Sequence, residues 1–429
     1  MKRLSLLFYG LLCFGIFPVM AADCPALVQQ ALAATTTLCH ETGKNQACYG
    51  NVNLKAKPNS NVSDFHFSQP GDRVDINTIK SLQLSPMTLD TGEWGVALMN
   101  VQANLPSTAP ANLTLLAFGD VTLENDVPSS TALDISVVGN NAVNARLVPS
   151  LNAGIVGTLK PNQTVTALDR LGDSSWLRVK LPDSDQMGWV KSDFITSEGD
   201  VRTLNIVDGS QPYYAPMQAF TFKSGTEASN CAEVPENGLI IQTPEGSGEV
   251  QLWINQVVVK LGSTVYFQAQ PDGNMTVTTV EGHATVESMG VTYTAVAGSS
   301  LHIPVDANMN AVAPPTLPQA YEVKDVANLP IDHLQRKIKI HPPLTPQEVD
   351  AQQQKQIANN PLVPCPAPKD GPKPKEAKCP NPDAKPPKGD KGPGPADGKP
   401  KPPEPAKPPE PPKPPKDEKP PEPPKPPKP

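Results

Sequence analysis

The chain is poor in aromatic residues and histidine, and it lacks the short motifs that mark common enzyme classes. Phe, Trp and Tyr make up 5% of its 429 residues, and six histidines are scattered at positions 40, 66, 283, 302, 333 and 341. No H-E-x-x-H, G-x-S-x-G or G-x-x-x-x-G-K-[ST] sequence occurs, so no motif indicates a zinc protease, a serine hydrolase or a P-loop nucleotidase. We therefore expect a protein that is not an enzyme and that uses no cofactor or metal.

Long hydrophobic runs are also missing, apart from one at the start of the chain. Lys2 and Arg3 precede an apolar stretch of about 16 residues, and Ala21 and Ala22 follow it. A membrane-spanning helix needs about 20 apolar residues, whereas a basic start, a shorter apolar run and small residues are typical of a signal peptide. The sequence predicts a signal peptide at residues 1–22, export, and no integral membrane segment after cleavage.

Cysteine is infrequent, but its number becomes even once the predicted signal peptide is removed. Seven cysteines occur, and Cys13 lies within that peptide. An even number in an exported chain favours disulfides, although sequence alone does not choose their pairing. The candidates are Cys24, Cys39, Cys48, Cys231, Cys365 and Cys379. We expect two local pairs, one joining Cys365 to Cys379 and one joining two of the first three cysteines, which leaves the third for Cys231.

The two parts of the chain carry charge of opposite sign. The net charge is −7, but residues 361–429 hold 15 Lys and 10 acidic residues, so the remainder carries −12. An acidic body argues against nucleic acid as a partner. The C-terminal segment, rich in Pro and Lys, cannot bury a core, so we expect a disordered tail that extends up to about 200 Å. Such a tail would either thread a cell-wall layer or act as a solubilising spacer.

The segment after the predicted signal peptide, residues 23–135, begins with a helical pattern and continues with strands. The apolar stripe that helical spacing predicts comprises Ala26, Leu27, Ala31, Ala34 and Leu38. Two strand-like runs, residues 93–105 and 113–121, flank a segment rich in turn formers and predict a hairpin. We expect an N-terminal α+β domain that contains cysteines.

Residues 143–195 consist of short strand-like runs separated by turn formers. They include Val143-Asn144-Ala145-Arg146, Trp176-Leu177-Arg178-Val179 and Gly188-Trp189-Val190. This pattern resembles the bacterial SH3 family over about 55 residues. The resemblance implies a small barrel at residues 140–198 that binds cell-wall peptides or glycans.

Within this segment the candidate ligand-binding residues are Arg146, Trp176 and Trp189. Tryptophan offers a large contact area at a small cost in conformational entropy. Packing in the core of the barrel is the alternative role for both tryptophans.

Residues 239–305 contain a further series of strand-like runs, with a tight-turn signal at Asp272-Gly273-Asn274. The runs Glu281-Gly282-His283-Ala284-Thr285-Val286 and Ala297-Gly298 resemble the FecR-type periplasmic domain over about 65 residues. The resemblance implies a FecR-like β domain at residues 239–310, preceded by a linker at residues 199–238. Residues 311–360 would form a second linker with a short helix.

The sequence as a whole predicts a mainly β, multi-domain protein with an N-terminal α+β domain, a small SH3-like barrel, a FecR-like β domain and a disordered Pro-rich tail. We expect it to be secreted, or periplasmic and associated with the cell wall. Its expected role is the binding or scaffolding of a cell-wall polymer or an envelope protein. Two alternatives stay open: a ligand-sensing subunit of an envelope signalling complex, and a wall hydrolase with its site in the N-terminal domain.

Overall fold

The computed structural model describes residues 24–103, 105, 112–128, 132–182, 186–225 and 234–360. The predicted signal peptide, the Pro-rich tail, Cys231, Cys365 and Cys379 lie outside these residues. In the described ranges, no helix has both the length and the apolar character needed to cross a membrane.

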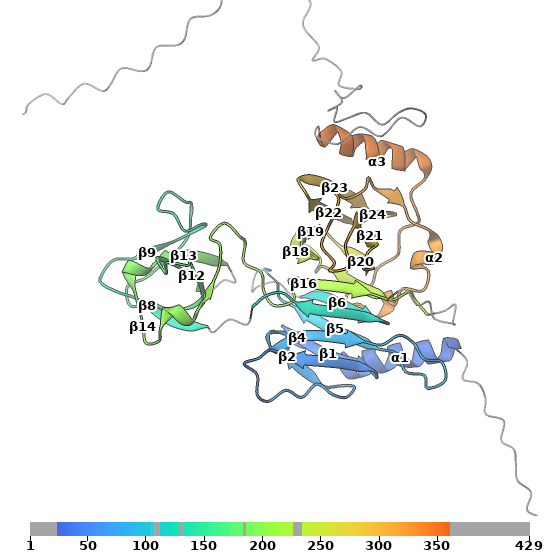
Figure 1. The fold of residues 1–429 in the computed structure, drawn as a ribbon, viewed down its shortest axis with the longest axis horizontal. Coiled ribbons are helices and arrows are strands. Elements are labelled where there is room, and N and C mark those ends of the chain that lie inside the picture. The colour runs from blue at the N-terminus through green and yellow to red at the C-terminus, as the bar shows by residue number, and fades with distance from the viewer. Residues whose placement is uncertain are drawn as a thin grey trace, which may run out of the picture. The chain divides into compact units, whose positions relative to one another are not determined.

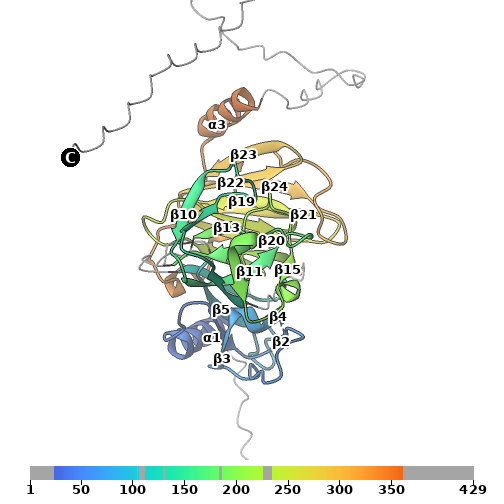
Figure 2. The ribbon, with the colours of Figure 1, turned by 90° about the vertical axis from the view of Figure 1, so that its left-hand side faces the viewer.

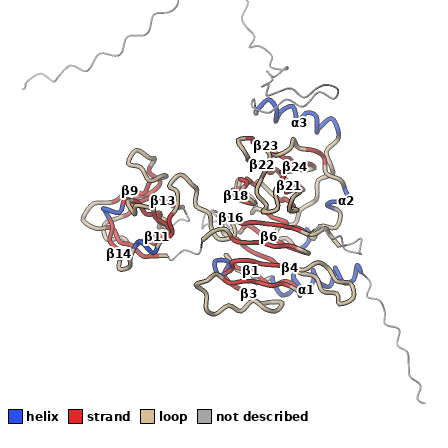
Figure 3. The backbone as a smooth tube through the Cα atoms, in the orientation of Figure 1, coloured by secondary structure: helices blue, strands red, loops and turns tan. Residues whose placement is uncertain are grey.

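Strands account for most of the regular structure, which confirms the prediction of a mainly β protein (Figure 3). The helices are α1 (Cys24–Cys39), α2 (Val323–Val326) and α3 (Pro346–Asn359). Short 3-10 turns lie at η1 (Ile76–Thr78), η2 (Ser192–Phe194), η3 (Val201–Thr203) and η4 (Ile331–His333).

The described strands form three sheets, which we name I, II and III. Sheet I runs in the order β25 (Gln319–Ala320), β24 (Ser299–Pro304), β21 (Asn274–Glu281), β20 (Thr264–Ala269), β17 (Gly238–Gln242), β6 (Leu113–Phe118), β5 (Val96–Val101), β1 (Gln46–Asn51) and β3 (Arg73–Asp75). Sheet II runs in the order β2 (Leu54–Pro58), β4 (Ile79–Leu84), β7 (Val121–Asn125), β16 (Ala219–Ser224), β18 (Val250–Ile254), β19 (Val257–Leu261), β22 (His283–Ser288) and β23 (Val291–Val296).

Sheets I and II pack face to face around one apolar core, which draws on strands from both (Figure 1). Strand β6 shows why the sandwich holds together, because all six of its residues are buried. Leu115 faces the core between the two sheets, whereas Leu116 and Phe118 belong to a second core on the outer face of sheet I. Helix α1 and the segment around Tyr321 cover that outer face. A central strand buried on both faces is expected to be largely apolar, and the sequence of β6, apolar except for Thr114, fits this position.

The strands predicted from local patterns are present. Strands β5 and β6 pair antiparallel with Val96 opposite Phe118, which confirms the predicted hairpin. The runs predicted between residues 249 and 295 correspond to β18–β23, and Asp272 has a positive φ of 56° in the turn between β20 and β21. Apart from this hairpin, the sequence did not predict which strands pair with one another. Strand β17 pairs with β6 of the N-terminal segment, with Leu239 opposite Ala117. Residues 46–125 and 219–304 therefore share both sheets.

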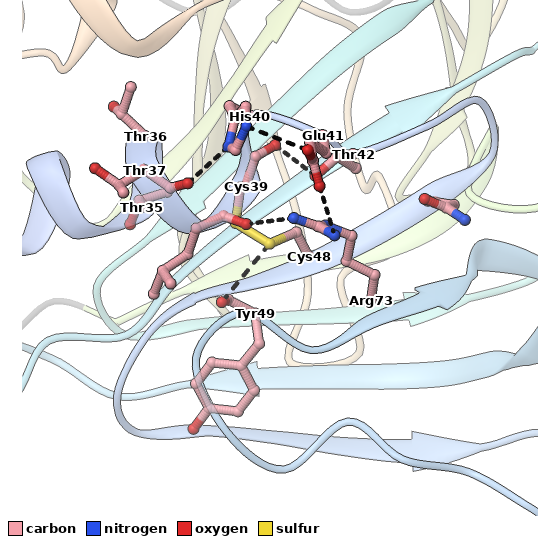
Figure 4. The surroundings of a disulfide bond; sticks show 12 residues. Thr35, Thr36, Thr37, Cys39, His40, Glu41, Thr42, Cys48, Tyr49 and Arg73 are labelled. Carbon is pink, nitrogen blue, oxygen red and sulfur yellow. Dashed lines mark hydrogen bonds and ion pairs between the residues drawn. A yellow bond between two sulfur atoms is a disulfide. The ribbon is translucent and has the colours of Figure 1, made fainter.

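Helix α1 lies where the sequence predicts a helix, but its buried face differs from the predicted stripe. The buried residues are Val28, Ala31, Leu32, Thr35 and Cys39, whereas Ala26 is exposed. A disulfide between Cys39 and Cys48 fixes the orientation, because it joins the last residue of α1 to the buried middle of β1 (Figure 4). It confirms a local pair among the first three cysteines. Cys24 is disulfide-bonded as well.

Sheet III is the module formed by residues 133–206. Its order is β10 (Ile155–Leu159), β9 (Val143–Arg146), β13 (Met187–Lys191), β12 (Trp176–Lys180), β11 (Thr164–Arg170), β8 (Leu133–Val137) and β14 (Ile195–Ser197), and β15 (Asn205–Ile206) pairs with β11. The sheet surrounds its own apolar core, which includes Ala145, Leu177 and Val190. Among the described residues, the pairing path does not close between its end strands β10 and β14, so the small barrel that the sequence predicts is present as an open sheet.

Residues 311–360 pack on the sandwich. The sequence predicts a linker with a short helix for this segment. Arg336 forms two hydrogen bonds with the Glu281 carboxylate, at 2.6 and 2.7 Å. Helix α3 begins with a capping box between Thr345 and Glu348, and Pro346 occupies its first turn. This 14-residue helix is the helix that the sequence predicts in the segment, and it starts shortly after Pro342 and Pro343.

Replacing both cysteines of the observed disulfide, as Cys39→Ala with Cys48→Ala, should lower the free energy of unfolding by about 2–3 kcal/mol, because the bond restricts the unfolded chain. The loop is short, with a sequence separation of 9. Urea unfolding of the full chain measures the loss, and hydrogen exchange in β1 should accelerate. The matched control is Thr37→Ala, an exposed change on the same helix. An unchanged unfolding midpoint in the cysteine variant would contradict this account.

Candidate functional site

A groove of about 350 Å³ lies on sheet III, and we call it the SH3 groove. It is lined by Val138, Gly139, Asn140, Asn141, Ala142, Val143, Asn144, Arg146, Leu151, Trp176, Lys191 and Phe194. The loop after β8 forms one wall, and the end of β13 with η2 contributes another. The volume falls at the lower end of the range for ligand pockets, about 300–1,000 Å³.

Two of the three predicted ligand-binding residues line this groove. Trp176 begins β12 and is 7% exposed, so most of its ring packs in the module and a small part reaches the groove. Arg146 ends β9, and its Nη1 donates a hydrogen bond of 2.7 Å to the carbonyl oxygen of Ala153. This bond fixes the guanidinium against the loop that follows β9. Both residues therefore have restricted positions before a ligand arrives.

Exposed apolar side chains form the part of the groove that solvent reaches most easily. Phe194 is 47% exposed, Leu151 is 61% exposed and Val138 is 42% exposed. Exposed apolar side chains that gather around a concave site are characteristic of binding surfaces, whereas isolated ones are common on any protein. The backbone N–H of Val138 donates to the carbonyl oxygen of Phe194, which places these two groove residues side by side.

The charged residues of the groove lining are both cations. Lys191 pairs with the exposed carboxylate of Asp193, and Arg146 provides the second positive charge. Three asparagines, at positions 140, 141 and 144, add amide donors and acceptors. Arginine and lysine donate hydrogen bonds and carry no acceptor, so the groove suits a ligand with a carboxylate or another anionic group.

Trp189, the third predicted residue, does not line the groove and is 2% exposed. The Arg178 guanidinium carbon lies 5.1 Å from the centre of the Trp189 ring and 5.6 Å from the centre of the Tyr213 ring. Arg178 also donates to Asp169 Oδ2 at 3.0 Å and to the Gln211 carbonyl oxygen at 3.1 Å. Trp189 therefore has the packing role that the sequence left open as an alternative.

The Arg178 cluster, made of Arg178, Asp169, Trp189 and Tyr213, holds part of the expected linker against sheet III. Burial raises the pKa of Asp169, although the charge and hydrogen bond of Arg178 act in the opposite direction. Burial, together with the Asp169 carboxylate, raises the pKa of Tyr213 to about 12. The side chains of Arg178 and Asp169 are 5% and 10% exposed, so each charge depends on the other.

Sequence reasoning missed Phe194, Leu151 and Lys191 because they lie in loops or at strand ends, outside the motifs that carry the family pattern. One signal was available: Phe194 is a rare aromatic residue that directly follows Ser192 and Asp193, where a turn is expected. Trp253, another aromatic residue of the chain, lies on β18, where it contacts Tyr214 with ring centres 6.2 Å apart. Across the described ranges, His, Cys, Asp and Glu form no group of three that could hold a metal ion.

Trp189→Ala should destabilise sheet III by about 3–5 kcal/mol, because it removes a large buried ring and one face of the Arg178 packing. Phe194→Ala, by contrast, should change stability by no more than about 0.5 kcal/mol, since nearly half of that side chain is already exposed. Hydrogen exchange of β12 and β13 in the full chain measures both effects. Equal acceleration in the two variants would show that Phe194 is a packing residue and would contradict its assignment to a binding surface.

Comparison with known protein families matches one segment of the chain, which lies within the module of sheet III. Residues 141–196 match the bacterial SH3 domain family, and this range includes every groove residue except Val138, Gly139 and Asn140. No curated protein matches the chain. The comparison with protein families supports no FecR-like domain. The match identifies residues 141–196, which lie within the module of sheet III, as a bacterial SH3 domain.

Proposed function

We propose that this protein is a non-enzymatic binding or scaffolding component of the bacterial cell envelope and that it holds its ligand in the SH3 groove. The observation that carries the proposal is the combination of exposed Phe194 and Leu151 with the cations Arg146 and Lys191 around one concavity. The match to the bacterial SH3 family supports a ligand-binding or wall-associated role.

The groove favours a small, partly apolar unit that carries a negative charge. Its volume of about 350 Å³ accommodates a few residues of a peptide or one to two sugar units. A carboxylate would accept hydrogen bonds from Arg146, and the Phe194 ring would cover an apolar face of the same unit. Wall peptides carry free carboxylates, so a cell-wall polymer fits this chemistry, and an envelope protein with a carboxylate in an extended segment is the second candidate.

An envelope location also fits the disulfide chemistry. The Cys39–Cys48 bond joins two buried cysteines, and such bonds persist in oxidising compartments such as the periplasm or the outside of the cell. Together with the SH3 domain, the bond is consistent with an extracellular location. Export of the chain belongs to the function that we propose.

Two other functions were open from the sequence, and the described contacts favour neither. A sensing subunit would rely on the FecR-like resemblance of residues 239–305, whose strands are shared with the N-terminal segment in one sandwich. A wall hydrolase would need a pair of free carboxylates in the N-terminal segment. There, Asp72 accepts hydrogen bonds from the backbone N–H groups of Ser68 and Gln69 and closes a turn.

The test is co-sedimentation of residues 23–429 with purified peptidoglycan, using the double variant Phe194→Ala with Leu151→Ala. Affinity should fall at least tenfold, which corresponds to about 1.4 kcal/mol, because two exposed contact side chains are removed. The matched control is Ile155→Ala, which removes an apolar side chain that is 55% exposed on the same sheet but outside the groove. The control should bind as the unchanged protein does.

A chain that ends at Asn360 separates the domain from the tail in the same assay. It should keep its binding, because the groove is intact. Binding that disappears with the tail would make the attraction a charge effect of residues 361–429 and would overturn the proposed role of the groove. Binding by none of the variants, with capture of a membrane protein from detergent extracts, would favour the sensing alternative.

A further inference from the structure

Helix α3 lies next to the end of sheet II at which β23 is the last strand (Figure 1, Figure 2), and hydrogen bonds join the two. An edge strand leaves every second pair of backbone N–H and C=O groups without a neighbouring strand. In β23 these groups belong to Thr292 and Thr294, because the hydrogen bonds that they form run to α3. The contact is therefore one between a helix and a strand edge.

Three amide side chains of α3 and its C-cap make this contact, and we call them the amide ladder. Their spacing of four places Gln352, Gln356 and Asn360 on one face of the helix. Gln356 accepts from the Thr294 N–H at 3.2 Å and donates to the Thr294 carbonyl oxygen at 3.2 Å. Asn360 accepts from the Thr292 N–H at 3.3 Å and donates to the Thr292 carbonyl oxygen at 2.7 Å. Gln356 and Asn360 thus each form the two hydrogen bonds that the backbone of a neighbouring strand would form.

The ladder is the main contact of α3, and Gln353 Nε2 adds one further hydrogen bond, to the Pro318 carbonyl oxygen at 2.9 Å. Gln356 is the buried residue of this helix, and a further hydrogen bond joins Gln352 to the Thr294 carbonyl oxygen at 3.0 Å. In the described part of the chain, Oε1 of Gln352 is buried and has no hydrogen-bond partner. Hydrogen bonds of this kind contribute about 1 kcal/mol each, and an unpaired buried oxygen opposes them. Helix α3 therefore covers the edge of β23, and separating the two requires a moderate free energy.

The other edges of the sandwich have protection of their own. Strand β2, at the opposite edge of sheet II, carries Lys55, Lys57 and Pro58, and charged side chains and proline discourage pairing. Sheet I ends in the short strands β3 and β25, of three and two residues. By contrast, β23 reads Val-Thr-Tyr-Thr-Ala-Val, a regular strand without charge or proline. Such a sequence readily pairs with another strand once it is uncovered.

We propose that β23 is a strand-accepting surface that α3 covers, and that its partner is β23 of a second copy of this chain. The edge is complementary to itself under a twofold axis. If Thr292 pairs with Thr294 of the second copy, and the reverse, four backbone hydrogen bonds form in one antiparallel register. Tyr293 then lies opposite its own counterpart. This register satisfies the same four backbone groups that the amide ladder satisfies in the single chain. This inference is independent of the SH3 groove, and the two can fail separately.

The test compares the full chain with the ladder variant, in which Gln352, Gln356 and Asn360 are each changed to Ala. Sedimentation velocity across a concentration series measures association, and hydrogen exchange measures protection of residues 291–296. The ladder variant should dimerise at least tenfold more tightly than the unchanged protein. The matched control changes Gln354 and Asn359 to Ala, which removes two exposed amides from the same helix, and it should behave as the unchanged protein does.

A second substitution separates pairing through β23 from association of a partly unfolded chain. Thr294→Pro in the ladder variant removes a backbone donor that the proposed register requires, and an edge strand tolerates proline. It should return the ladder variant to a single chain. The proposal is overturned if the ladder variant associates no more than the unchanged protein, or if Thr294→Pro leaves its association intact.

Discussion

The pairing of β6 with β17 is the constraint on which the sandwich depends. It joins two segments that lie more than 100 residues apart, and it places Leu239 and Ile241 of β17 beside Ala117 and Leu115 of β6. The SH3 domain lies between β6 and β17 along the chain. The strands that flank it, β7 and β16, pair with each other in sheet II. The core between sheets I and II cannot form until both segments are present. Closing so long a loop lowers the entropy of the chain. The free energy gained by burying β6 on both faces must exceed that cost.

Local structure was predictable from the sequence to a large extent, because it depends on local patterns. Runs of strand-forming residues marked β18 and β19, and Asp272 to Asn274 marked the turn after β20. The choice of pairing partner was not predictable, since many apolar strands would fit beside β6. The face of α1 was predicted only in part, with Ala31 buried as expected and Ala26 exposed, because the helix contains small apolar residues on several sides. Its orientation follows from the Cys39–Cys48 bond.

The candidate site was predictable in part for a similar reason. Trp176 and Arg146 lie on strands of the family pattern, and both reach the SH3 groove. Trp189 was a candidate for ligand binding because of its large side chain, but its ring packs against Arg178. Phe194 and Leu151 come from turns whose positions depend on how β9 and β13 pair. Residues in such turns acquire a binding role only through the fold, and a sequence pattern of strands says little about them.

The central claim is that the SH3 groove is the surface that contacts the envelope. Hydrogen exchange of residues 23–429 with and without a soluble muropeptide that carries a free carboxylate tests it most directly. The account predicts protection in the loop at residues 138–144 and in the segment around Phe194, and no change in β12, whose strand is already buried. Protection confined to the sandwich, or no protection at saturating muropeptide, would contradict it.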